Sequence, residues 1–223
     1  MIGRALGWAG LAALMVPALA FALYAASRGL SVRVPGEMAT SRFVLGTAGD
    51  YAIYGHMVAG GLLTALAPLQ AVGAVRRRWP AVHRGAGRVL VALALATGAG
   101  GLAHIAMRGT VGGPWMSASF ALYGALLIWA ALGTWRAARA RSAAHPLWAA
   151  RLIVLALGSL VYRMLYWGNA ILAGGAGVAP DGSFTGAFDR FALLAFFLPG
   201  LLAVELWSRR LRRRGAAAMA GAA

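Results

Sequence analysis

The sequence predicts an all-α integral membrane protein, a bundle of six transmembrane helices with both termini in the cytoplasm. Of its 223 residues, 61% are hydrophobic and only 12% are charged. A soluble domain is usually about 45–50% apolar and about 25% charged, so this chain has too little polar surface to cover a soluble globule. Cysteine is absent, which excludes disulfides, thiolate metal sites and cysteine nucleophiles.

Six apolar stretches are long enough to cross a bilayer, since a span needs about 20 mostly apolar residues. Glycine- and proline-rich turns separate several of them, at 34–36, 112–114 and 174–182. The first stretch exceeds the apolar core of a signal peptide, about 7–15 residues, so we expect it to be retained. The chain would then be one transmembrane domain over 1–223, with a basic cytoplasmic tail at 208–223. The expected helices cover residues 5–26, 52–75, 89–107, 116–135, 148–172 and 191–207.

Arginine sets the expected orientation. The chain has 21 basic residues, all of them arginine, against five acidic ones, for a net charge of +16. Segments that carry most of the arginine stay on the cytoplasmic side of a membrane, which explains the charge without a nucleic-acid partner. The arginines assigned to that side are Arg4, Arg76, Arg77, Arg78, Arg84, Arg88, Arg136, Arg139, Arg141, Arg151, Arg209, Arg210, Arg212, Arg213 and Arg214.

Four histidines form two pairs at matched depths. His83 and His145 lie at the inner face, on the approaches to the third and fifth expected helices. Haem iron takes axial imidazoles, so haem b held by this inner pair is the sharpest cofactor hypothesis. His56 and His104 lie near the outer face on consecutive helices, which pack about 8–10 Å apart. That spacing is too narrow for a porphyrin, so a metal ion, a proton relay or two structural histidines remain the alternatives there.

Glycines lie one helical turn from the outer histidines. Gly60 follows His56 by four residues, and Gly100 and Gly101 precede His104 by four and three. They could provide the bare helix surface that a flat macrocycle needs, or they could let two helices pack closely, as small residues do in membranes. The sequence alone leaves both interpretations open.

Basic residues accompany the inner histidines. Arg84 and Arg88 lie at the start of the third expected helix, where they would approach the acidic groups of a cofactor. In the fifth helix, His145, Trp148 and Arg151 are spaced by three residues, and this spacing predicts one shared helix face.

Arg163 lies deep in the fifth apolar stretch. An unpaired guanidinium there costs at least about 2.5–3.5 kcal/mol. We therefore expect Arg163 to face the bundle, to stack on Tyr166 or Trp167, to pair with helix carbonyls, or to hold an anionic group.

The acidic residues give no sign of catalysis. Glu205, in the last expected helix, should form a structural ion pair with Arg151, with Arg209 as the local alternative. The sequence contains no nucleophile elbow, phosphate-binding loop or zinc-protease motif, so no catalytic residue is predicted.

Two blocks of sequence, within roughly residues 50–210, carry a family resemblance. The first comprises His56 to Gly60, Pro68 to Gln70, and Arg76 to Val89. The second comprises His145, Trp148, Arg151 and Arg163, then Leu198-Pro199 and Ala203 to Trp207. Both resemble a bacterial membrane family catalogued as domain of unknown function 2306. The resemblance implies a multi-pass protein of the bacterial inner membrane, and it brings no established activity.

The chain departs from that family's pattern at three positions. It has Gly200 where the family often has asparagine, and Pro146 where the family often has arginine or another polar residue. His104 lies outside the pattern, so the resemblance favours the other three histidines as functional residues.

Three function classes follow. The first is a cofactor-binding, electron-transfer-like subunit with a redox partner. The second is a transporter or an anion- or lipid-handling protein that uses Arg163 together with the inner basic cluster, and Pro68 and Pro199 could break helices as transporter sites require. The third is a structural or accessory membrane protein. The candidate cofactor-binding residues are His56, His83, His145, Arg84, Arg88, Arg151 and Arg163, and the candidate metal ligands are His56 and His104.

Overall fold

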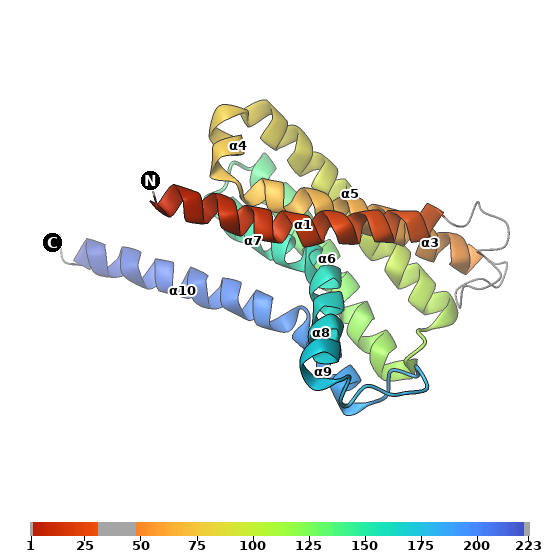
Figure 1. Ribbon diagram of the computed structural model, residues 1–223. Coiled ribbons are helices and arrows are strands. Elements are labelled where there is room, and N and C mark those ends of the chain that lie inside the picture. The colour runs from red at the N-terminus through yellow and green to blue at the C-terminus, as the bar shows by residue number, and fades with distance from the viewer. Residues whose placement is uncertain (1, 31–47, 221–223) are drawn as a thin grey trace.

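The structure, a computed structural model, describes residues 2–30 and 48–220 and confirms the all-α fold class. Every regular element in these two ranges is a helix, and α1 lies along α3 in Figure 1. Each long helix packs on the next one in the chain, from α1 through α3, α5 and α6 to α7. The helices are α1 (Ile2–Leu30), α3 (Ala48–Ala71), α4 (Gly73–Arg78), α5 (Pro80–Arg108), α6 (Gly113–Arg139), α7 (His145–Ala156), α8 (Gly158–Ala173), α9 (Ala187–Ala195) and α10 (Leu198–Ala220).

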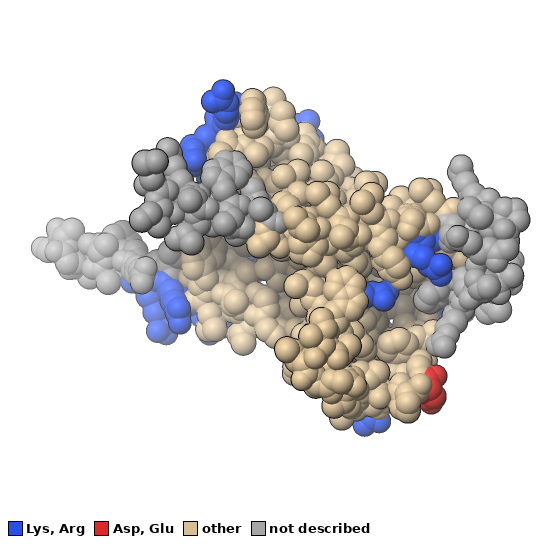
Figure 2. Space-filling model, in the orientation of Figure 1, with Lys and Arg blue, Asp and Glu red and all other residues tan. Residues whose placement is uncertain are grey.

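The helices are those of a multi-pass membrane protein. Within the described ranges, five segments are long and apolar enough to cross a bilayer, and α7 with α8 makes a sixth when the bent pair counts as one span. The start of α1 and the end of α10 lie at the same end of the bundle, as Figure 1 shows, which is the arrangement that six crossings would give. The face drawn in Figure 2 is mostly uncharged, with the basic side chains in separate groups.

Several helix boundaries differ from those expected. The second expected helix divides at Val72 into α3 and α4. The third begins at Pro80, nine residues early, because proline suits the first turn of a helix. The last expected span breaks between α9 and α10, and α10 then continues through the basic tail to Ala220. The turn expected at 34–36 lies outside the described residues.

Glycines bring neighbouring helix backbones together. A Cβ atom on Gly61 of α3 would lie 2.8 Å from the carbonyl oxygen of Ala22 in α1. One on Gly98 of α5 would lie 2.6 Å from Ile128 in α6. Small residues at such crossings let membrane helices approach closely and gain van der Waals contact.

A bend of 44° separates α7 from α8. Two hydroxyl groups contact the backbone just before it. Tyr123 donates to the carbonyl oxygen of Leu155 at 2.6 Å, and Thr64 shares its hydrogen between the carbonyl oxygens of Gly60 in α3, at 2.8 Å, and Ala156, at 3.1 Å. Gly158 admits the Tyr123 ring, since a Cβ there would lie 2.8 Å from that ring. In Figure 1, α8 consequently leaves the direction of α7 and diverges from α1, α3 and α5.

Gly133 tests the role of close helix contacts. We expect Gly133→Ala to destabilise the protein by about 1–3 kcal/mol, since overpacking a filled site costs that much and the new methyl group would overlap the Trp148 ring. Thermal unfolding of the detergent-purified protein measures the effect. Gly168→Ala is the matched control, because a Cβ there meets no atom within 4 Å. Equal melting temperatures for the two variants would contradict this account of the packing.

Candidate functional site

A pocket of about 240 Å³ lies between α5, α6 and α7, at the end of the bundle that holds both termini. We call it the inner pocket. Both inner histidines, His83 and His145, line it together with Arg84 and Arg88. The two sequence blocks that carry these residues lie far apart in the chain, and the fold brings them together around one cavity.

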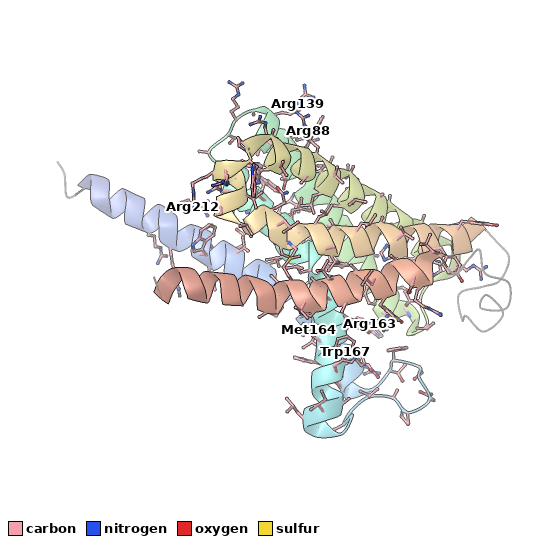
Figure 3. The ribbon with its side chains drawn as sticks, turned by 45° about the horizontal axis from the view of Figure 1, so that its top comes forward. Arg88, Arg139, Arg163, Met164, Trp167 and Arg212 are labelled. Atoms are coloured by element: carbon pink, nitrogen blue, oxygen red, sulfur yellow. The ribbon has the colours of Figure 1, made fainter. Side chains whose placement is uncertain are left out.

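The inner pocket is strongly basic. Its lining residues include no carboxylate, and Arg139 of α6 adds a third guanidinium that the sequence analysis did not single out. Figure 3 shows Arg139 close to Arg88. The Nδ1 atoms of His83 and His145 are both buried and make no hydrogen bond within the described part of the chain. A buried polar atom without a partner costs about 1–3 kcal/mol, so these two nitrogens suit a ligand that can pair with them.

Haem b does not fit this pocket as the residues stand. Pockets for drug-sized ligands measure about 300–1,000 Å³, and a porphyrin is at least as large as such ligands. The whole inner pocket, which His83 and His145 help to line, measures about 240 Å³. The inner histidines are thus brought together as expected, around a space suited to a smaller group.

A second pocket, of about 410 Å³, lies toward the opposite end of the bundle, between α3, α5, α6 and α8. We call it the outer pocket. His56 and His104 both line it, so the outer pair is also brought together. Arg163 lines this pocket and not the inner one, and Figure 3 shows it well away from Arg88. Arg163 and the inner basic cluster therefore line different cavities, and the expectation that they act together stays a prediction.

His56 is fixed by its contacts with α5. Its Nδ1 lies 2.7 Å from the carbonyl oxygen of Thr97, and because a carbonyl only accepts, Nδ1 carries the hydrogen and Nε2 remains an acceptor. A Cβ on Gly101 would lie 3.0 Å from this Nδ1, and one on Gly100 would lie 3.3 Å from the Cβ of His56. These glycines seat the imidazole and pack two helices together, so they offer no bare surface to a macrocycle.

The outer pair alone supplies few ligands for a metal. Among the side chains that the structure describes, no three of His, Asp or Glu come together. Zinc sites in proteins use three or four protein ligands, and His56 and His104 supply two. Two arginines, Arg108 and Arg163, also line the outer pocket, and the rest of its lining is mostly hydroxyl-bearing, aromatic and aliphatic.

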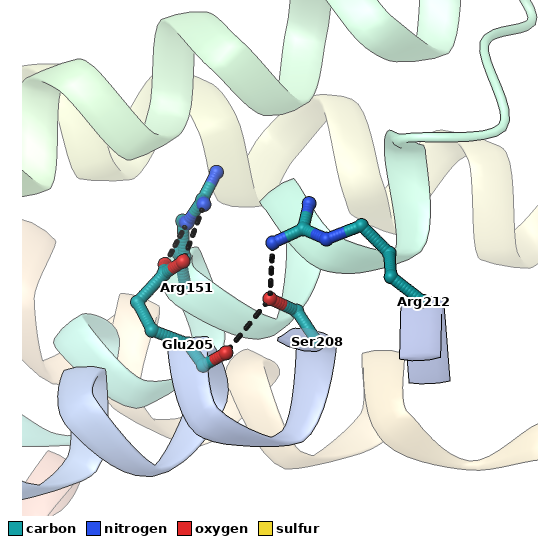
Figure 4. Close-up of polar contacts among 4 residues, drawn as sticks. All are labelled: Arg151, Glu205, Ser208 and Arg212. Atoms are coloured by element: carbon teal, nitrogen blue, oxygen red, sulfur yellow. Dashed lines mark hydrogen bonds and ion pairs between the residues drawn. The ribbon is translucent and has the colours of Figure 1, made fainter. Parts of the chain in front are cut away.

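Arg151 is engaged in a structural ion pair. Its Nε and Nη2 atoms donate to Glu205 Oε1 at 2.6 Å and Oε2 at 3.0 Å, as Figure 4 shows. Its guanidinium also lies over the rings of Trp129 and Trp148, 5.3 and 4.6 Å from their centroids. The expected pairing with Glu205 is thus present, and Arg209 is not the partner. His145, Trp148 and Arg151 were expected to share one helix face, but of the three only His145 lines the inner pocket.

Arg163 makes a different contact from those expected. Its guanidinium lies 5.6 Å from the ring centroid of Tyr24 in α1, rather than on Tyr166 or Trp167 of its own helix. Among the described side chains, no carboxylate is within ion-pair distance of it.

Asp189 is a buried carboxylate whose role the sequence analysis missed. It is fully buried, and its Oδ1 accepts from the Tyr166 hydroxyl at 2.7 Å. Its Oδ2 accepts from the backbone N–H groups of Ala179 and Gly186, both at 2.9 Å. The residue therefore folds the 174–186 connection onto the start of α9. The only sequence sign is an acid in the first helical turn after a glycine-rich segment.

Comparisons with models of protein families, with curated proteins and with solved structures find no match to this chain. The resemblance to domain of unknown function 2306 consequently stays a prediction.

The ion pair between Arg151 and Glu205 can be tested by substitution. Glu205→Gln should lower the free energy of unfolding by about 1–3 kcal/mol, because it leaves a guanidinium that is only 12% exposed without its anion. The double variant Arg151→Met, Glu205→Leu should recover part of that loss, since no charge is then left unpaired. Arg209→Gln is the control. Thermal unfolding measures the three variants and the unmodified protein, and a double variant less stable than Glu205→Gln would argue against the pairing.

Asp189 should matter more to stability than its exposed neighbour in the same connection. We expect Asp189→Asn to cost about 1–3 kcal/mol, since an amide cannot accept all three hydrogen bonds at once. Asp181→Asn should have little effect, because Asp181 is exposed and receives the N–H of Ser183. Limited proteolysis of the 174–186 connection provides the readout, and equal cleavage of both variants would contradict the assignment.

Proposed function

We propose that the chain is an anion- or lipid-handling protein of the bacterial inner membrane, which binds a phosphate group in its inner pocket. The supporting observation is the cluster of three arginines and two histidines around a small cavity lined by no carboxylate. We also propose membership of the family catalogued as domain of unknown function 2306. The convergence of Arg84, Arg88, His83 and His145 on one pocket supports that membership, since these residues come from both resembling blocks.

The chemistry of the pocket favours phosphate. Guanidinium groups match phosphate oxygens with paired hydrogen bonds, and Arg84, Arg88 and Arg139 all border the same cavity. His83 and His145 line the same cavity, and an imidazole N–H can donate to the same anion. A volume of about 240 Å³ is suited to such a compact group.

The surroundings suit a headgroup at a membrane surface. The Arg139 guanidinium lies 4.9 Å from the ring centroid of Trp135, and that tryptophan is 43% exposed. Tryptophan marks the interface between hydrocarbon and headgroups, and the cytoplasmic leaflet is rich in anionic lipid. Phosphate can reach such a position on a lipid or as a free anion, and both sources present the same group to the site.

Electron transfer through haem is the less supported class. It rests on the two inner histidines, which the structure does bring to one cavity, but the cavity is smaller than a porphyrin needs.

Two arginines of α6 provide a matched test. Arg139 lines the inner pocket, whereas Arg136 is exposed on the same helix and does not. We expect Arg139→Gln to weaken phosphate binding about tenfold or more, because a hydrogen bond to a charged group contributes about 1.5–3 kcal/mol. Arg136→Gln should bind as the unmodified protein does. Thermal shift with inorganic phosphate, and native mass spectrometry from nanodiscs with and without phosphatidylglycerol, measure the two sources separately.

The outcomes separate the candidates. Stabilisation by inorganic phosphate would assign a free anion, and retention of phosphatidylglycerol alone would assign a lipid headgroup. Equal binding by the Arg136 and Arg139 variants, or no binding in either arm, would contradict the proposal. A Soret band that shifts on reduction and disappears in His83→Ala would replace it with electron transfer.

A further inference from the structure

We infer that the outer pocket binds a second ligand, an amphiphile with a carboxylate head and an apolar tail, which pairs with Arg163. This site is distinct from the inner pocket, because no residue lines both. Its volume, about 410 Å³, falls within the range of small-molecule sites.

The bend between α7 and α8 creates the space. Hydrogen bonds from Tyr123 and Thr64 hold the backbone at Leu155 and Ala156. After the bend, α8 diverges from α3 and α5 (Figure 1), and the outer pocket lies between these helices. The cavity is therefore built by specific contacts at the bend.

Arg163 supplies a cation that pairs with no carboxylate among the side chains that the structure describes. It lies ten residues before the end of α8 at Ala173, about 15 Å along the helix axis. A guanidinium at such a depth is costly unless it is paired. Its contact with the Tyr24 ring, at 5.6 Å, offsets only part of that cost, since cation–π contacts contribute about 0.5–2 kcal/mol.

The described carboxylates are all engaged elsewhere. Glu205 pairs with Arg151, and Asp189 accepts from Tyr166 and two backbone N–H groups. Asp181 accepts from the N–H of Ser183 in the exposed connection. A ligand is thus the available source of an anion for Arg163 among the parts that the structure describes.

The rest of the lining defines the remainder of the ligand. Aliphatic and aromatic side chains, among them Ile105, Met116, Phe120 and Leu127, suit an apolar tail. Thr97 also lines the pocket, and its buried hydroxyl makes no hydrogen bond in the described part of the chain. A carboxylate matches the guanidinium fork of Arg163 with two parallel hydrogen bonds, and its single charge is cheaper to bury than the two of a phosphate monoester. Arg108 also lines the pocket and adds to its positive charge.

The path of entry is lateral, from the bilayer. Met164 and Trp167 follow Arg163 on α8 and are 47% and 56% exposed. Figure 3 shows the three side chains together on this helix. Tyr24 of α1, on the other side of Arg163, is half exposed as well. The guanidinium consequently lies at a lipid-facing mouth between α1 and α8, where a membrane amphiphile can reach it.

Photolabelling tests the inference. The probe is a palmitate analogue with a diazirine on its chain, added to the full-length protein in phosphatidylcholine nanodiscs, and the labelled peptides are mapped by mass spectrometry. We expect labels on the segments of α5, α6 and α8 that line the outer pocket. Palmitate should compete, and the uncharged hexadecanol should not. Arg163→Gln should reduce labelling about tenfold, and Arg190→Gln, an exposed arginine on α9 outside the pocket, should not.

A second variant keeps the test decisive if Arg163→Gln does not fold. Ile105→Trp fills the pocket and leaves the arginine in place, and it too should reduce labelling while the elution profile of the protein stays unchanged. Labels spread over lipid-facing α1 and α10, equal competition by hexadecanol, or full labelling of Arg163→Gln or Ile105→Trp would each overturn the inference. The inner-pocket proposal is unaffected by any of these results, since its test uses phosphate and residues of α6.

Discussion

The bend between α7 and α8 is the constraint on which both pockets depend. Two hydroxyl groups from other helices, those of Tyr123 and Thr64, donate to carbonyl oxygens of consecutive residues just before it. A straight fifth span would keep Arg163 in line with His145, as the sequence suggests. The two residues are nonetheless about 27 Å apart along the chain's helical path, so they reach opposite ends of the bundle, and the 44° change of direction turns α8 away from α3 and α5 beside the outer pocket.

Close contacts between helices complete the frame around these cavities. Glycines admit a neighbouring backbone at Gly61 and an imidazole at Gly101. Arg151 joins α7 to α10 through Glu205 and lies against two tryptophan rings. Such a paired and stacked arginine serves the packing of the bundle, whereas the arginines of the inner pocket have no carboxylate among the side chains that line it. Similar residues therefore have different roles, which their surroundings decide.

The sequence predicts the helical class and the inner cluster well, because both follow from local pattern. Apolar runs identify the spans, and the spacing of His83, Arg84 and Arg88 places them near the start of one helix. The place of Arg163 could not be predicted, since the bend depends on hydroxyl groups from helices far away in the chain. Asp189 was missed for a similar reason, because its hydrogen-bond donors come from a connection that folds back only in three dimensions.

The bend also divides one membrane crossing into two halves, and a substitution in one half should affect a different pocket from a substitution in the other. Leu157 separates α7 from α8, and every residue of this crossing that lines the inner pocket precedes it, while every one that lines the outer pocket follows it. A substitution on either side can therefore abolish one cavity and spare the other. Variants of this one crossing thus fall into two groups: those before Leu157 affect the inner pocket, and those after it affect the outer pocket.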